Sequence, residues 1–445
     1  MIRPATVRIG AGAGFAGDRI EPALELVEKG ELDFLVFECL AERTIALAQN
    51  ARRSDPDGGF DPMLLERMRR ILPAARARGV RIVTNAGAAN PLGAARAVAA
   101  LAGSLGIGPL RIAAVLGDDV LDTVRSEPFA LIDREGTSAD LPPIISANAY
   151  LGAAPIADGL ARGADIVITG RVGDPALFVG PLIDAFGWSL DDPTLMGKAT
   201  VIGHLLECAG QLTGGYFADA GRKQVPGLAR LGFPLAEVSA DAGAVFTKVP
   251  GSGGQLSLAS CKEQLLYEIL DPGAYHQADV VADFRSVRLE EVGPDRVAVS
   301  GGGGSVRPDT LKVSIGYDDG FIGEGQISYA GPGAVDRARL AIAVVRERLA
   351  LIDARIDELR CDLIGMDAVD RTGLGSCPRE IRVRICGRAA REEDAASIGA
   401  EVEALYTNGP FGGGGATRSV RPVVAVASTL IPRDRVSPSV VMVEA

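Results

Sequence analysis

Three segments of the chain place acidic, amide or guanidinium side chains directly after short apolar runs. Glu38 follows one such run, Asn85 and Asn90 follow the next, and Arg171 and Asp174 follow a third. The carboxyl ends of parallel strands meet at one edge of a sheet, where α/β proteins bind ligands, so we expect these side chains to lie close together. Neighbouring carboxyl groups raise one another's pKa, as acid–base catalysis requires. We therefore expect Glu38 and Asp174 to transfer protons, and the two asparagines and Arg171 to bind a substrate anion. Because Asp174 precedes a proline, it can also cap the following helix.

A second acid–base pair lies on an expected helix. His204 and Glu207 are three residues apart, so their side chains share a helix face. The pair can act on a substrate, or it can be a buried histidine hydrogen-bonded to a carboxyl group. A metal site would need a further ligand, and the chain has only 2 histidines. We expect catalytic roles for both residues and no metal, with Tyr216 after the helix contacting substrate.

Glycines near the N-terminus match a dinucleotide-binding pattern. Gly12, Gly14 and Gly17 have the spacing GxGxxG between an expected strand and an expected helix, and Glu38 ends the next strand. Such glycines let backbone amides approach a phosphate at a helix N-terminus. Asp18 opposes this interpretation because an acid would repel the phosphate. Binding of a nicotinamide cofactor, contact with another ligand and a purely structural turn all stay open.

We expect a substrate carboxylate or phosphate to sit over the Gly10–Gly17 turn or the Asn85–Asn90 turn, where Arg171 would hold it with its planar fork. A hydrocarbon part of the substrate needs apolar contacts instead. We expect it against three aromatic side chains, Phe15, Phe178 and Tyr216.

The elements that position these residues follow from the apolar pattern. In residues 1–275, continuous apolar runs alternate with helical stretches, which is typical of parallel strands covered on both faces. In residues 276–445, apolar runs flank Gly293-Pro294-Asp295 and Asp318-Asp319-Gly320, which predicts two antiparallel hairpins. We expect an α/β fold with a doubly wound, mostly parallel sheet, followed by a C-terminal α+β domain.

Composition excludes several classes of protein. The 445 residues carry a net charge of −11 without a basic block, which argues against a nucleic-acid partner. No apolar run reaches the ~18 residues of a membrane helix, and the N-terminus lacks a signal-peptide pattern. The 6 cysteines form no CxxC pair. We expect a cytoplasmic homo-oligomer with free thiols.

Five segments, taken together, resemble the acyclic terpene utilisation protein A family. They are residues 10–49, 169–182, 204–219, 263–283 and the GGGGATRSV stretch at 412–420. The resemblance implies a role in the catabolism of branched acyl-CoA compounds, and the family has no established NAD role. Some members carry an extra C-terminal ferredoxin-like domain. Because this chain ends without one, we expect a separate small ferredoxin-like subunit as a partner.

The function expected from these observations is a lyase or hydratase that acts on a small branched acid or its CoA thioester. Acid–base groups beside anion-binding groups are what the addition or removal of water next to a carbonyl requires. No cofactor is expected, apart from CoA as part of the substrate. The alternatives are an NAD(P)-dependent oxidoreductase that uses the glycine turn and a non-catalytic subunit of an acyl-CoA-processing complex.

Overall fold

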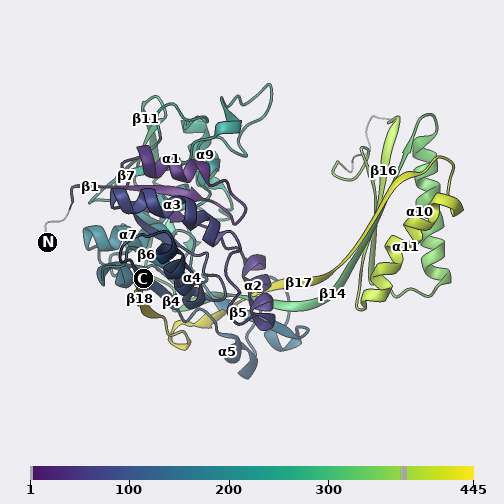
Figure 1. Ribbon diagram of the computed structural model, residues 1–445, viewed down its shortest axis with the longest axis horizontal. Helices are drawn as coiled ribbons and strands as arrows, with labels where there is room; N and C mark the ends of the chain where they lie inside the picture. The colour runs from purple at the N-terminus through teal and green to yellow at the C-terminus, as the bar shows by residue number, and fades with distance from the viewer. Residues whose placement is uncertain (1–3, 371, 373–377, 445) are drawn as a thin grey trace. The chain divides into compact units, whose positions relative to one another are not determined.

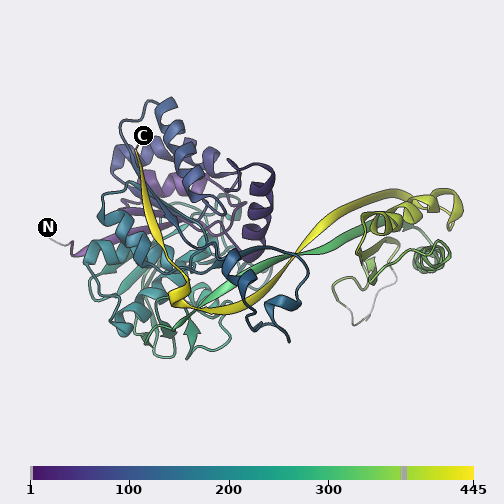
Figure 2. The ribbon, with the colours of Figure 1, turned by 90° about the horizontal axis from the view of Figure 1, so that it is seen from below.

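The computed structural model describes residues 4–370, 372 and 378–444 (Figure 1). The chain forms two compact units, one of residues 1–316 with 426–445 and the other of residues 317–425. Two long strands, β14 (Thr310–Ala330) and β17 (Gly414–Pro432), have residues in both units. They are neighbours in a sheet and run side by side in both ribbon views (Figures 1 and 2).

A ten-stranded mixed sheet forms the centre of the first unit, with the order β11-β12-β8-β7-β1-β2-β3-β6-β4-β18. The strands from β1 to β4 in this order are parallel, whereas the strands on either side are antiparallel. The expected α/β fold is confirmed, and its sheet is mixed. The strands are β1 (Thr6–Ala13), β2 (Phe34–Phe37), β3 (Arg81–Thr84), β4 (Arg111–Leu116), β6 (Ile166–Thr169), β7 (Pro234–Ser239), β8 (Ala244–Lys248), β11 (Arg288–Gly293), β12 (Arg296–Ser300) and β18 (Ser439–Glu444).

Two groups of helices pack with this sheet. The first group is α1 (Glu21–Lys29), α3 (Leu64–Arg78) and α4 (Pro91–Ser104), and the second is α6 (Ala154–Ala161), α7 (Ala176–Phe186) and α8 (Pro193–Glu207). Further helices are α2 (Glu42–Ser54), α5 (Leu121–Ser126) and α9 (Leu258–Leu266). No described helix is long and apolar enough to cross a membrane.

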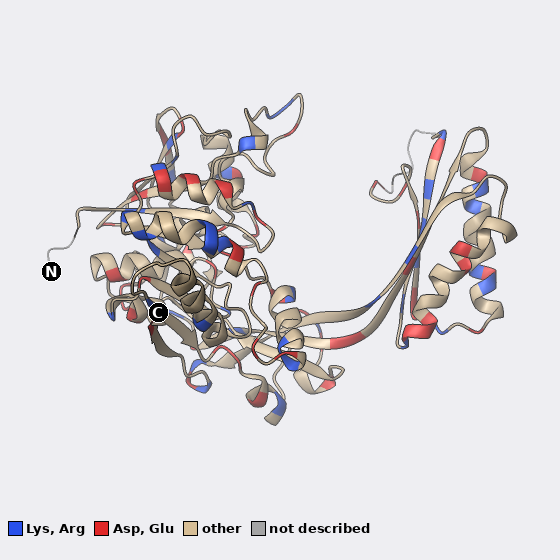
Figure 3. Cartoon of the chain, in the orientation of Figure 1, with Lys and Arg blue, Asp and Glu red and all other residues tan. Residues whose placement is uncertain are grey.

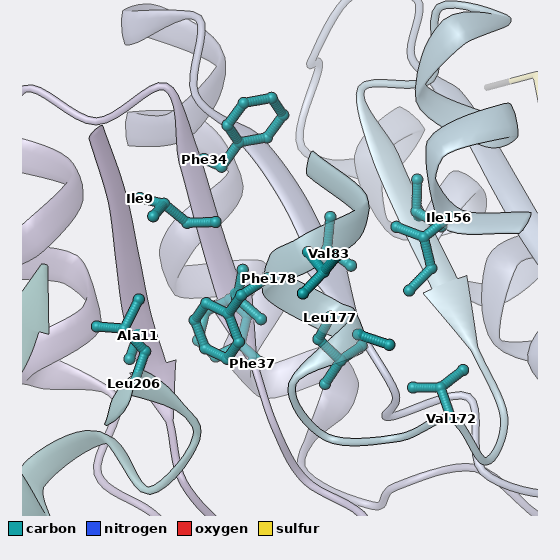
Figure 4. Close-up of a cluster of buried hydrophobic side chains, with 14 of the residues drawn as sticks. Ile9, Ala11, Phe34, Phe37, Val83, Ile156, Val172, Leu177, Phe178 and Leu206 are labelled. Carbon is teal, nitrogen blue, oxygen red and sulfur yellow. The ribbon is translucent and has the colours of Figure 1, made fainter. Parts of the chain in front are cut away.

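Side chains of β1, β2 and β3 meet side chains of α7 and α8 in the core (Figure 4). Phe37, Phe178 and Leu206 are fully buried there, and burial of each such side chain stabilises the fold by about 1.5–3 kcal/mol. The expectation that Phe178 contacts substrate is therefore wrong in this structure, because its ring fills the core beneath the sheet.

The expected domain boundary near residue 275 falls inside the first unit. The predicted hairpin around Gly293 forms as β11 and β12, but β12 pairs with β8 and so extends the large sheet. A small three-stranded sheet of β9 (Tyr275–His276), β10 (Val281–Asp283) and β13 (Gly303–Ser305) also belongs to this unit. The last strand, β18, returns to the sheet beside β4.

The second unit has the element order of a ferredoxin-like βαββαβ fold. β14, α10 (Ala334–Leu351), β15 (Glu358–Ile364), β16 (Glu380–Ala389), α11 (Glu392–Asn408) and β17 follow one another along the chain. The sheet order is β15-β16-β14-β17. Both helices pack on β16, and glycines of β14 admit α11, since a Cβ on Gly323 would lie 1.7 Å from the carbonyl oxygen of Ala395.

The predicted hairpin at Asp318-Asp319-Gly320 is wrong, because β14 continues through these residues as one strand. Phe321–Ala330 pairs with β16 along its whole length, so a reversal at this point would leave that ladder unpaired. The residues that predicted a turn lie within the strand instead. Gly320 takes a φ of +73°, and its N–H donates to Asp318 Oδ1 at 3.2 Å.

Candidate functional site

The parallel strands bring the predicted acid–base and anion-binding residues to one edge of the sheet. Glu38 follows β2, Asn85 follows β3, and Arg171 lies two residues after β6. Asn85 Nδ2 donates to Glu38 Oε1 at 2.9 Å, and Arg171 Nη1 donates to the carbonyl oxygen of Leu40. The predicted convergence at the carboxyl ends of the strands therefore occurs. We call Glu38, Asn85, Arg171 and Asp174 the strand-end cluster.

Glu38 is held in a form that suits a proton donor. Its side chain is buried, and burial followed by the nearby charge of Asp174 raises its pKa to about 8. Oε1 accepts hydrogen bonds from Asn85 Nδ2 and from the N–H of Leu40, at 2.9 and 2.8 Å. No hydrogen bond to Oε2 occurs among the described residues. Glu38 therefore favours its protonated form at neutral pH, with Oε2 free of partners among the described residues.

Arg171 is buried at 1% exposure, and protein acceptors occupy its guanidinium. Nε and Nη2 donate to the carbonyl oxygen of Val172 at 2.8 and 2.6 Å, Nη1 donates to Leu40, and Nη2 also donates to Asp174. The expected planar fork on a substrate anion is not free in this arrangement. Burial disfavours the charged form, but Asp174 and other nearby acids keep the pKa of Arg171 above its ordinary value. Arg171 therefore supplies a fixed positive charge within the cluster.

Asp174 pairs with this arginine rather than capping the next helix. α7 begins at Ala176, and its start has no side-chain hydrogen bond from the preceding residue. Desolvation raises the pKa of Asp174, and the charge of Arg171 opposes this effect. Its side chain keeps 38% exposure. Asp174 is thus the more accessible carboxyl group of the cluster.

The sequence analysis did not predict that Tyr150, Glu42 and Lys312 form a group beside Arg171. The ring of Tyr150 lies 4.6 Å from the guanidinium, and its hydroxyl donates to Glu42 Oε1 at 2.6 Å. Lys312 Nζ donates to the same carboxylate at 3.2 Å. Although burial raises the pKa of Glu42, the bonds from Tyr150 and its own backbone, with the charge of Lys312, lower it to about 2. Tyr150 follows β5 (Ile144–Ala149), a strand that the apolar pattern did not reveal.

Asp118 is a further buried acid that the strand-end argument could have found. It follows β4 as Glu38 follows β2, and it accepts hydrogen bonds from the N–H of Arg171 and from Asn148 Nδ2, both at 2.9 Å. Burial raises its pKa to about 6. Asp118 therefore fixes the loop that carries Arg171.

His204 and Glu207 form the predicted contact at the end of α8. His204 Nδ1 and Glu207 Oε1 are 2.7 Å apart, and both side chains are buried. Burial raises the pKa of Glu207 to about 7; His204 opposes the rise and the charge of Asp174 adds to it. The pair thus lies within electrostatic reach of the strand-end cluster. His204 Nε2 and Glu207 Oε2 are buried without a hydrogen-bond partner among the described residues.

The glycine pattern near the N-terminus serves packing. Gly12 lies within β1, where a Cβ would meet the Phe37 ring at 2.6 Å, and a Cβ on Gly14 would lie 2.5 Å from the backbone of Cys208. The N–H of Gly14 donates to Asp18 Oδ2 at 3.0 Å. A side-chain carboxyl group therefore occupies the amide that a phosphate would need. Gly17 packs on the Phe15 ring, which is 60% exposed.

Asn90 has a structural role. Its Oδ1 accepts from the N–H of Gly93 at 3.0 Å and caps α4, while Nδ2 donates to the carbonyl oxygen of Gly58 at 2.9 Å. Both ends of the amide are thus engaged by the backbone.

Tyr216 lies on the surface with 86% exposure, in a backbone conformation with a φ of +60°. Its ring meets the edge of Tyr267, with centroids 6.3 Å apart. Both line a pocket of about 70 Å³ that also includes Gln264. Gln264 Nε2 donates to the carbonyl oxygen of His204 at 3.1 Å. This pocket therefore adjoins the end of α8, and we call it the Tyr216 pocket.

In the described part of the chain, neither the thiols nor other metal-binding side chains form a second candidate site. No group of three or more His, Cys, Asp or Glu side chains there could hold a metal ion. Cys39 lies 3.3 Å from Arg67 Nη1, but burial keeps its pKa far above the ordinary value. The free thiols are Cys39, Cys208, Cys261, Cys361 and Cys386, and Cys377 lies outside the described residues.

Comparison with protein families matches residues 7–442 to a family described as acyclic terpene utilisation family protein AtuA. Comparison with curated proteins and with solved structures found no match.

Proposed function

The chain belongs to the acyclic terpene utilisation family AtuA, and we propose that it is a lyase or hydratase that acts on a branched acid or its CoA thioester. The family description places the chain in acyclic terpene utilisation. The proposed step is the addition or removal of water next to a carbonyl group of such a compound.

The protonated Glu38 at the strand-end cluster carries the proposal. A carboxyl group that keeps its proton near neutral pH and leaves Oε2 free can protonate a departing hydroxyl group. The buried charge of Arg171 lies beside it and can stabilise the negative charge that develops on the substrate carbonyl. Both features are ready before substrate binds.

The His204–Glu207 pair supplies the base in this scheme. When Glu207 is ionised, Nδ1 of His204 carries the proton and Nε2 presents a lone pair. Nε2 takes the proton from the carbon next to the carbonyl, a carbon–carbon double bond forms, and the carbon–oxygen bond breaks. The hydroxyl group leaves with the Glu38 proton as water. Proton exchange with solvent restores both groups, and hydration is the reverse sequence.

The experiment is a mass measurement on candidate substrates. The chain is incubated with branched 3-hydroxyacyl and enoyl compounds, as free acids and as CoA thioesters, alone and with any small ferredoxin-like protein that co-purifies with it. Turnover changes the substrate mass by about 18 units, the mass of water. Absence of a change in every arm overturns the proposal. Turnover that occurs only with the co-purifying protein and is retained in Glu38→Gln would assign the chemistry to that partner and make this chain a non-catalytic subunit.

A further inference from the structure

A tyrosine from the small sheet completes a polar site at the end of α8. Tyr275 lies in β9, and its ring contacts the His204 ring edge-on, with centroids 5.5 Å apart. Phe284 packs against both rings, also at 5.5 Å. The three rings therefore pack against one another. These contacts hold the Tyr275 ring in place without the help of its hydroxyl group.

The hydroxyl group of Tyr275 has no hydrogen-bond partner in the described part of the chain, and it is not fully enclosed. Burial, followed by the charges of Glu207 and Asp174, holds the pKa of this phenol far above its ordinary value. The phenol is therefore a lasting hydrogen-bond donor beside carboxyl groups.

His204 and Glu207 supply the complementary acceptors. His204 is 1% exposed, and neither its Nε2 nor Glu207 Oε2 has a partner among the described residues. Leaving such buried polar atoms unpaired is unfavourable. A group that both accepts and donates a hydrogen bond would satisfy the donor and an acceptor together, and a hydroxyl group or a water molecule has that property.

We propose that Tyr275 and Glu207 bind the reacting oxygen of the substrate, the hydroxyl group of a 3-hydroxy acid, with the Tyr275 hydroxyl donating to it and Glu207 Oε2 accepting from it, while His204 Nε2 stays free to act as the base. This inference rests on the proposed function and deepens it, because it names the hydroxy acid as the form that is recognised. Tyr275 is then a substrate-binding residue of the reaction.

Binding measurements test this site without requiring turnover. Affinities for 3-hydroxy-3-methylbutanoate and for 3-methylbutanoate, which lacks the hydroxyl group, are measured by calorimetry on the full chain. The parent protein prefers the hydroxy acid by roughly thirtyfold, as expected for two hydrogen bonds. Tyr275→Phe keeps the ring contacts and removes one of the two bonds, so the preference falls to about fivefold. Tyr329→Phe, which removes another unpartnered buried hydroxyl group in the second unit, keeps the preference.

The outcomes separate the two proposals. A preference that stays at the parent value in Tyr275→Phe, with an unchanged melting temperature, overturns the oxygen site, as does a parent protein without preference or without binding. A preference lowered in Tyr275→Phe, together with no mass change for any substrate, supports the oxygen site and overturns the lyase or hydratase assignment.

Discussion

The strand-end cluster of the first unit and a network on the sheet of the second unit both contain acidic and basic residues, yet they differ in burial. Figure 3 shows acidic and basic positions along the strands of the second unit. In the second unit, Arg384 bridges Glu324 and Asp362 on neighbouring strands, at 2.7 and 3.1 Å. Although burial raises the pKa of Glu324, bonds from Gln326 and Arg384 bring it below its ordinary value. Acids and cations pair there in partial contact with solvent.

The strand-end cluster reverses this situation. Glu38 is buried with another acid near it, and its pKa rises to about 8. A charge network that satisfies itself stabilises a surface modestly, whereas buried acids that outnumber their cations can transfer protons at neutral pH. The contrast supports our proposal that the first unit carries the chemistry.

The largest expected effect is on turnover. Glu38→Gln preserves the shape and one acceptor oxygen but removes the proton, so kcat falls about 10²–10⁴-fold, the usual contribution of a general acid. Glu324→Gln is the matched control and leaves kcat unchanged. Steady-state kinetics on the substrate found by mass measurement provides the test. Equal loss in both variants would remove the distinction between the two networks.

Removal of the buried cation should strongly affect stability. Arg171→Met leaves Asp174 and two carbonyl groups without their donor, so the free energy of unfolding falls by about 3–5 kcal/mol. Arg384→Met breaks pairs that are partly exposed and costs about 0–1 kcal/mol. Urea denaturation followed by circular dichroism measures both. Similar losses would show that burial does not separate the two arginines.

The pH dependence of stability has opposite signs at the two networks. Between roughly pH 5 and 8 folded Glu38 keeps a proton that the unfolded chain has lost, so the free energy of unfolding falls with rising pH, by at most ~1.4 kcal/mol per pH unit. Glu324 contributes stability that is present above its ordinary pKa and lost as the pH falls through its lowered folded pKa. Denaturation of Glu38→Gln across this range should therefore show a flatter slope than the parent, while Glu324→Gln keeps the parent slope. An unchanged slope in Glu38→Gln would mean that Glu38 ionises normally.

The smallest effect concerns the exposed aromatic residues. We propose that the Tyr216 pocket and Phe15 contact the hydrocarbon tail of the substrate. Tyr216→Ala should weaken binding of a ten-carbon terpenoid acid about fivefold, through lost apolar contact, and leave a five-carbon acid unaffected. Phe411→Ala in the second unit, at 84% exposure, is the control. Calorimetry that finds the same weakening for both acids would place the tail elsewhere.

Much of the first unit follows from local sequence. The apolar runs before Glu38, Asn85 and Arg171 predicted parallel strands, and strand ends that share an edge brought these residues together. The spacing of His204 and Glu207 was likewise sufficient, because three residues along a helix place two side chains on one face. These inferences hold because periodicity and strand direction are local properties of a chain.

Tertiary structure decided which of these groups are free. The sequence shows that Arg171 lies near a binding edge, but only the fold directs its donors to Leu40, Val172 and Asp174. Tyr150 and Lys312 are far apart in sequence and meet on one carboxylate. In the second unit, pairing of β14 with β16 overrode a local turn signal at Gly320. Residue order specifies strands and helix faces, whereas burial, and with it charge and proton affinity, depends on what distant segments pack around each group.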